Sequence, residues 1–136
     1  GAGDSGQVLA RLEMPEPKTG EEIELPLEKL STKKGTSAVY QLHFSRIGRY
    51  ELVFRMSSAL GELAQLPISV FLNNTLQQTV TLNGTEGQTM ERVVTLPIRQ
   101  DGEKYMKLYF GESGIDMHRM FLRYVGKNDI ESIRNE

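Results

Sequence analysis

The chain has 136 residues, enough for one domain that buries roughly two thirds of its unfolded surface without metal or disulfide staples. Its 16 lysines and arginines nearly balance 18 aspartates and glutamates, so its charge favours neither nucleic acid nor a membrane surface as a partner. The absence of cysteine excludes thiol catalysis and disulfide bonds, and no apolar run approaches the roughly 20 residues of a membrane span.

The amino-terminal part contains two candidates for the first strand. Residues 1–7 are a polar lead-in, which we expect to remain from a cleaved signal or a cloning boundary. Residues 8–14 are rich in apolar side chains and end before two prolines, and residues 22–27 alternate apolar and polar positions. Either segment could be the first strand; Pro26 places the second at an edge or a strand end.

The segment 48–58, G-R-Y-E-L-V-F-R-M-S-S, is the clearest strand of the chain. Gly48 can adopt the backbone angles of a tight turn, and the residues after it alternate, with Phe54 predicted inside and Arg55 outside. Residues 38–45 alternate in the same way and precede it across that turn.

The remaining strand signals follow at regular spacing. They cover 67–73, 76–82, 92–98, 103–110 and 115–125, and Asn73-Asn74 is a hairpin turn because asparagine tolerates positive φ. We find no internal repeat, and the tail 127–136 is charged. The pattern predicts an all-β, antiparallel two-sheet sandwich over residues 8–126, forming a single domain.

The order of these segments resembles a known family. The pieces G-R-Y-E-L-V-F-R at 48–55 and G-I-D at 114–116, within a run from about 38 to 124, resemble family 6 and family 35 carbohydrate-binding modules, which are galactose-binding-like jelly rolls. The resemblance implies a non-catalytic domain attached to a secreted glycoside hydrolase or a related glycan-degrading protein. It therefore implies an extracytoplasmic location, whether periplasmic, cell-surface or secreted.

The jelly-roll order implies how the strands divide between the sheets. One sheet would hold 39–45, 104–110, 67–73 and 76–82, and the other would hold the first strand with 116–124, 49–56 and 91–98. The outer side of the former would carry a group suited to stacking on a sugar and hydrogen bonding to it: Tyr105, Tyr109, Phe71, His43 and Lys107, with Ser69 and Asn73. We call Phe71, Tyr105 and Tyr109 the aromatic face. Exposed aromatic residues also mark contacts with a neighbouring domain or subunit, which is the alternative.

The resemblance implies a second ligand position where the loops 29–37, 57–66, 83–89 and 111–114 would converge, which we call the loop end. These loops contain no Trp, Tyr or Phe, so a sugar there would be held by hydrogen bonds, with Ser58, Glu62 and Glu112 as the main candidates beside Gln65 and Ser113. The resemblance also implies a structural calcium at Asp116 with Glu13 as its partner. A carboxylate that caps a loop is the alternative, because calcium takes six or more oxygen ligands.

The sequence shows no catalytic motif. There is no G-x-S-x-G, no H-E-x-x-H and no phosphate-binding glycine loop, and His43 and His118 lie on separate strands. The acids of the loop end could hydrolyse a glycoside only in a deep cleft, which a small sandwich lacks. We therefore expect a carbohydrate-binding module rather than an enzyme, with a poly- or oligosaccharide and an attached catalytic domain or protein as partners. The alternative is a structural domain that packs against an enzyme through the aromatic face.

Overall fold

The structure, a computed structural model, describes residues 7–127, and within them the chain forms β-strands and no helix. The strands are β1 (Val8–Met14), β2 (Glu22–Glu24), β3 (Ser37–Phe44), β4 (Gly48–Ser57), β5 (Gln65–Leu72), β6 (Thr75–Asn83), β7 (Met90–Ile98), β8 (Gly102–Phe110) and β9 (Asp116–Gly126). The expected lead-in and tail lie outside the described residues, apart from Gln7 and Lys127.

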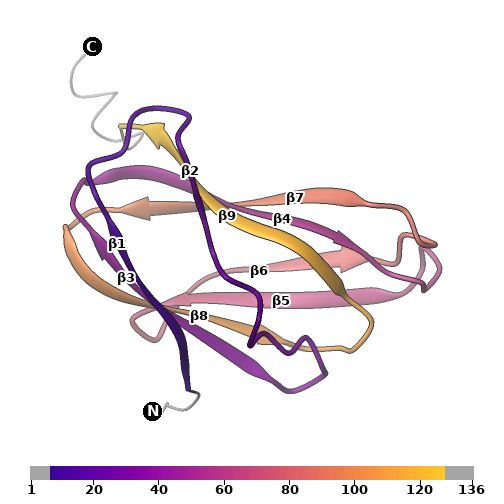
Figure 1. Ribbon diagram of the computed structural model, residues 1–136. Helices are drawn as coiled ribbons and strands as arrows, with labels where there is room; N and C mark the ends of the chain where they lie inside the picture. Colours follow the sequence, from indigo (N-terminus) through magenta and orange to yellow (C-terminus); the bar gives the residue numbers. More distant parts are fainter. Residues whose placement is uncertain (1–6, 128–136) are drawn as a thin grey trace.

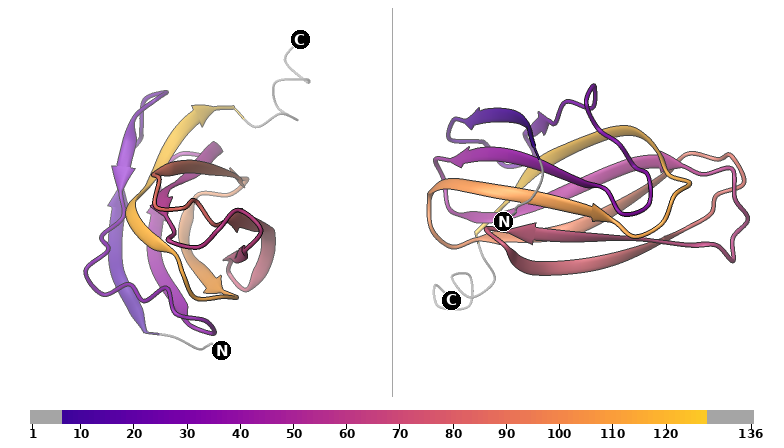
Figure 2. Two further views of the ribbon diagram at one scale, coloured as in Figure 1. Left: turned by 90° about the vertical axis from the view of Figure 1, so that its right-hand side faces the viewer. Right: turned by 90° about the horizontal axis from the view of Figure 1, so that it is seen from below.

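Two sheets stack as the layers of a sandwich (Figures 1 and 2). The five-stranded sheet has the order β1-β3-β8-β5-β6, and the four-stranded sheet has the order β2-β9-β4-β7. The predicted all-β, two-sheet architecture is confirmed. Since the described part of the chain contains no helix at all, it contains none that could cross a membrane.

The core lies between the sheets and is built from alternate positions of the strands. In β4, Tyr50, Leu52 and Phe54 are buried, and Phe110 of β8 faces them from the opposite sheet as part of the same apolar cluster. The predicted division of odd and even positions between the two faces is therefore confirmed for these residues, although Val53, at an alternate position of β4 that the pattern assigns to the outside, is also buried.

Buried tyrosines add specific polar contacts to this core. The Tyr50 ring makes edge-to-face contacts with Phe44 and Tyr124 at centroid distances of 5.0 and 5.1 Å, and its hydroxyl donates to the carbonyl of Arg46 at 2.7 Å. Burial raises the pKa of Tyr50 to about 12, and the neighbouring Tyr124 adds to the effect. The hydroxyl of Tyr40 donates to the carbonyl of Pro26 at 2.7 Å, and burial raises its pKa to about 12 as well.

Two of the predicted turns form for the expected reasons. Gly48 has φ +144°, and a Cβ added there would lie 2.5 Å from the carbonyl oxygen of Gly126 and 2.7 Å from the Tyr124 ring. Asn73 and Asn74 have φ values of 48° and 67°, which are the positive angles of a two-residue hairpin turn. The β5–β6 hairpin is thus confirmed in both place and type.

The amino-terminal strands differ from the expectation. Both candidate segments form strands, but they join different sheets: β2 pairs with β9 in the four-stranded sheet, whereas β1 pairs with β3 in the five-stranded sheet. The β1–β3 pairing is parallel, so the sandwich is not wholly antiparallel. The connection 15–36 is long enough to return the chain to the same end of the sandwich, which a parallel neighbour requires.

Candidate functional site

The aromatic face lies on the central strand of the five-stranded sheet and on its neighbour. Tyr105 and Tyr109 point outward from β8, with 46% and 41% of their surface exposed. Met106 and Leu108, which lie between them in the sequence, are buried. Phe71 lies beside them on β5 and is partly exposed. The sequence therefore predicted the direction of all three side chains correctly.

Cross-strand register fixes what surrounds the tyrosines. Tyr109 lies between Ser37 and Ser69, and Lys107 lies between Val39 and Phe71. The row through Lys107 continues across the sheet to Val8 of β1 and Leu76 of β6, so an apolar stripe crosses the middle of this surface. Hydroxyl groups thus border the stripe on the Tyr109 side.

Lys107 is the cation at the centre of this surface. Its Nζ lies 4.6 Å from the centroid of the Phe71 ring, a cation–π contact. Within residues 7–127 it forms no ion pair with a carboxylate. The ammonium group therefore keeps donors available beside the aromatic rings.

His43 lies on the same surface, toward the end where β3 finishes. Its cross-strand neighbours are Glu13 on β1 and Glu103 on β8, so it stands between two carboxylates rather than beside the tyrosines. His118 belongs to the other sheet, as expected.

The predicted loop end exists, because hydrogen bonds join the four loops in two pairs and the side chain of Leu60 in one pair lies close to Gly114 in the other. The hydroxyl of Thr32 donates to the carbonyl of Ile115 at 2.7 Å, and the amide of Lys34 donates to the hydroxyl of Ser113 at 2.8 Å. Two further loops meet through Ser58, whose amide donates to the hydroxyl of Thr85 at 2.8 Å. Several hydrogen bonds thus tie these loops together at one end of the sandwich.

The three main loop-end candidates lie in different environments. Ser58 is completely buried, and its hydroxyl accepts the amide of Leu60, so it supports the loop and does not reach the surface. Glu112 is exposed and lies 3.4 Å from the ammonium of Lys34. Glu62 lines a hollow of about 350 Å³ that also contains Met90 and Arg92, two residues that sequence reasoning missed. A methionine just before the start of a predicted strand was the sequence feature that could have pointed to this hollow.

The residues predicted for calcium are not brought together. Asp116 begins β9 in the four-stranded sheet beside the loop end, whereas Glu13 lies on β1 of the five-stranded sheet, opposite His43. Glu13 lies toward the end of the sandwich where β3 finishes and β8 begins, whereas Asp116 lies at the opposite end, across from Ser57, so the two carboxylates do not meet. No cluster of three or more His, Asp or Glu side chains suited to a metal occurs between residues 7 and 127.

One serine–histidine pair occurs at the surface of the four-stranded sheet. The Oγ of Ser57 and Nε2 of His118 are 2.7 Å apart, but Ser57 is buried. Within the described residues no carboxylate hydrogen-bonds to the other ring nitrogen, so the third member of a catalytic triad is missing. The pair closes the end of the β4–β9 ladder.

The outer face of the four-stranded sheet is partly covered by its own charged side chains. Arg119 bonds to Glu22 and Glu24, which raises the pKa of its guanidinium, and this group lies 4.0 Å above the ring of Phe121. Arg55 pairs with Glu91 on the neighbouring strand. These paired charges cover Phe121, whereas Val93 on β7 stays 40% exposed.

Comparisons with known proteins agree with this architecture. No family model matches the sequence. A β-glucosidase from Ruminococcus albus is 25% identical over 104 residues, which cover 76% of this chain and 11% of that protein. The chain therefore spans about a tenth of the length of the relative it matches.

Two solved structures show the fold. A family 35 carbohydrate-binding module from an environmental isolate has a TM-score of 0.56 at 18% identity, covering 70% of this chain and 69% of that one. The carboxy-terminal family 6 module of LamC, a laminarinase from the marine bacterium Zobellia galactanivorans, has a TM-score of 0.58 at 16% identity, covering 80% and 93%. The predicted jelly-roll sandwich of these two families is thereby confirmed.

Proposed function

We propose that this chain is a non-catalytic carbohydrate-binding module that holds a poly- or oligosaccharide against its aromatic face. The exposure of Tyr105 and Tyr109 on the central strand carries the proposal. They are four residues apart on β8 and hence about 13 Å apart along the strand, so they can contact separate units of one glycan chain.

The groups around the tyrosines match the chemistry of a sugar. The flat rings offer apolar surface to the C–H face of a pyranose, and sugar hydroxyls need hydrogen-bond partners at the rim of that contact. Ser69 and Ser37 flank Tyr109, and the Lys107 ammonium has donors that no carboxylate occupies within the described residues. This surface can therefore contact the C–H face of a sugar ring and also hydrogen-bond to its hydroxyls.

The module would serve as an accessory domain of a larger protein. The sequence likeness covers only a small part of a β-glucosidase, and the fold is that of modules described as carbohydrate-binding. We propose that the parent protein degrades glycans and works outside the cytoplasm, in the periplasm, at the cell surface or in the medium. By binding the glycan, the module would hold the parent enzyme close to its substrate.

Calorimetric titration tests the proposal. The purified chain is titrated with soluble neutral and acidic plant and host polysaccharides, and we expect saturable binding to at least one, strongly weakened in the Tyr105→Ala/Tyr109→Ala double variant. Flat heats throughout the panel at millimolar sugar would overturn it. Sedimentation of the chain with its parent protein, disrupted by the same variant without any sugar binding, would establish the structural alternative instead.

A further inference from the structure

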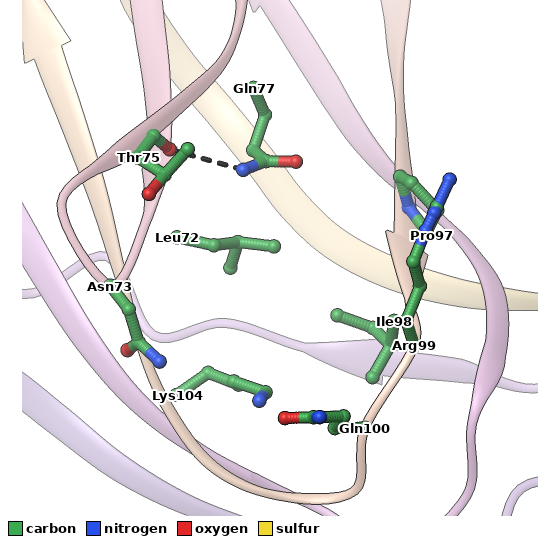
Figure 3. Close-up of a pocket in the computed structure, with 9 residues that line it drawn as sticks. All are labelled: Leu72, Asn73, Thr75, Gln77, Pro97, Ile98, Arg99, Gln100 and Lys104. Atoms are coloured by element: carbon green, nitrogen blue, oxygen red, sulfur yellow. Dashed lines mark hydrogen bonds between the residues drawn. The ribbon is translucent and has the colours of Figure 1, made fainter.

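A second hollow lies at the end of the sandwich opposite the loop end. It has a volume of about 520 Å³ and lies between the β5–β6 hairpin, the end of β7 and the β7–β8 turn (left-hand end of Figure 1). Figure 3 shows Leu72 and Ile98 at its centre, with Asn73, Lys104 and Gln100 along one side and Thr75 and Gln77 along the other. A volume of this size is in the range of small-molecule sites.

The charged side chains that line this hollow are all positive. Arg99 and Lys104 line it, and no Asp or Glu does. Neither cation forms an ion pair within the described residues. Asp101 lies in the same turn but is exposed and not among the lining residues, and Glu103 belongs to the opposite face of β8, across from His43. The two cations are thus available to an anion.

The amide side chains supply both kinds of hydrogen bond. The Oδ1 of Asn73 accepts the amide of Tyr105 at 2.8 Å, which holds the side chain and leaves its amino group to donate. The Nε2 of Gln77 donates to the carbonyl of Thr75 at 3.1 Å, which leaves its oxygen to accept. These groups match hydroxyls, each of which donates one hydrogen bond and accepts others.

We propose that this hollow binds a negatively charged sugar unit. The cations would contact its carboxylate or sulfate, the amides its hydroxyls, and Leu72, Ile98 and Pro97 its C–H surface. The volume exceeds what a bare inorganic anion occupies, and no aromatic residue lines it, so binding here would not depend on stacking.

The hollow is independent of the aromatic face. Lys104 and Tyr105 are successive residues of β8, so their side chains lie on opposite sides of the sheet. The Tyr105→Ala/Tyr109→Ala variant would therefore leave binding in the hollow intact, and each proposal can fail while the other stands.

The test is an NMR titration of the whole chain, isotope-labelled, with four probes. These are sodium glucuronate, glucose 6-sulfate, glucose and sodium acetate, followed through the side-chain amides of Asn73, Gln77 and Gln100. We expect at least one charged sugar to shift these signals with an apparent Kd about tenfold below that of glucose, which lacks the charge, and about tenfold below that of acetate, which lacks the hydroxyls and the C–H surface. The glucuronate and sulfate arms show which anionic group is preferred.

Charge-removing variants locate the site. Arg99→Gln/Lys104→Gln should weaken the charged sugar about tenfold, whereas Lys29→Gln/Lys33→Gln, which removes the same charge from an exposed loop, should leave the Kd unchanged. Equal binding of glucose and the charged sugars would overturn the proposal. Acetate binding as tightly as the charged sugars, or an equal effect of both double variants, would also overturn it.

Discussion

Replacing Tyr105 and Tyr109 by alanine tests the aromatic face quantitatively. A tyrosine side chain has about 200 Å² of surface, so 41% to 46% exposure leaves about 80–90 Å² of each, and a sugar lying on one side covers about half of it. At about 25 cal/mol per Å², roughly 40 Å² is worth about 1 kcal/mol, which is about fivefold in Kd for each tyrosine. The double variant should thus lose about 30-fold in affinity.

Calorimetry and affinity electrophoresis with the glycan that binds the natural chain measure this loss. More than half of each tyrosine surface is covered by the sheet, so the double variant should unfold at a lower urea concentration, and the affinities are compared under conditions where both chains are fully folded. Val93→Ala is the matched control, because Val93 is 40% exposed on the outer face of the opposite sheet. Unchanged affinity in the double variant, or an equal loss in the control, would refute the assignment of binding to this face.

Three further predictions concern the scaffold. Gly48→Ala should cost at least about 2 kcal/mol in urea unfolding, because its Cβ would meet backbone 2.5 Å away at a positive φ, whereas Gly61→Ala, with open space around it, should cost little. Tyr50 has a folded pKa of about 12, above the unfolded value of about 10, so its contribution to stability is present below pH 10 and is lost as the pH rises toward 12. Tyr50→Phe should flatten the decline of the urea midpoint over that range; an unchanged decline would contradict the pKa assignment. Arg119→Ala removes the partner of two β2 carboxylates and the cover of Phe121, so β2 amides should exchange hydrogen faster while β7 amides do not, as hydrogen-exchange mass spectrometry can show.

The sequence predicted the direction of side chains better than the pairing of strands. A period of two tells which residues share a face, so the outward Tyr105 and the inward Phe110 follow from β8 alone. The partner of a strand depends on contacts distant in sequence, and the apolar pattern of 8–14 fits either sheet. The parallel pairing of β1 with β3 could therefore not be predicted from the apolar pattern.

The candidate site was predictable where it rests on strands and not where it rests on loops. Ser58 is a polar residue in a connection, which favours a surface position, yet Thr85 from another loop binds its amide and carbonyl and the loops cover it. The hollow at the other end collects Asn73, Gln100 and Lys104 from separate turns and strand ends, and only the folded register brings them together.

Each sheet carries a cation over an outward phenylalanine, but only on the four-stranded sheet is that cation paired with carboxylates in the described chain. On the four-stranded sheet, Arg119 lies over Phe121 and is held by two glutamates, and only 2% of the phenylalanine surface is exposed. On the five-stranded sheet, Lys107 lies over Phe71 without a carboxylate partner in the described chain, and both tyrosines beside it stay exposed. Paired charges can therefore cover aromatic residues in this fold, and their absence around β8 leaves apolar rings and a free cation on one surface. Covering such a surface is favourable for a partner that offers both C–H groups to the rings and oxygen acceptors to the cation, and a glycan supplies both.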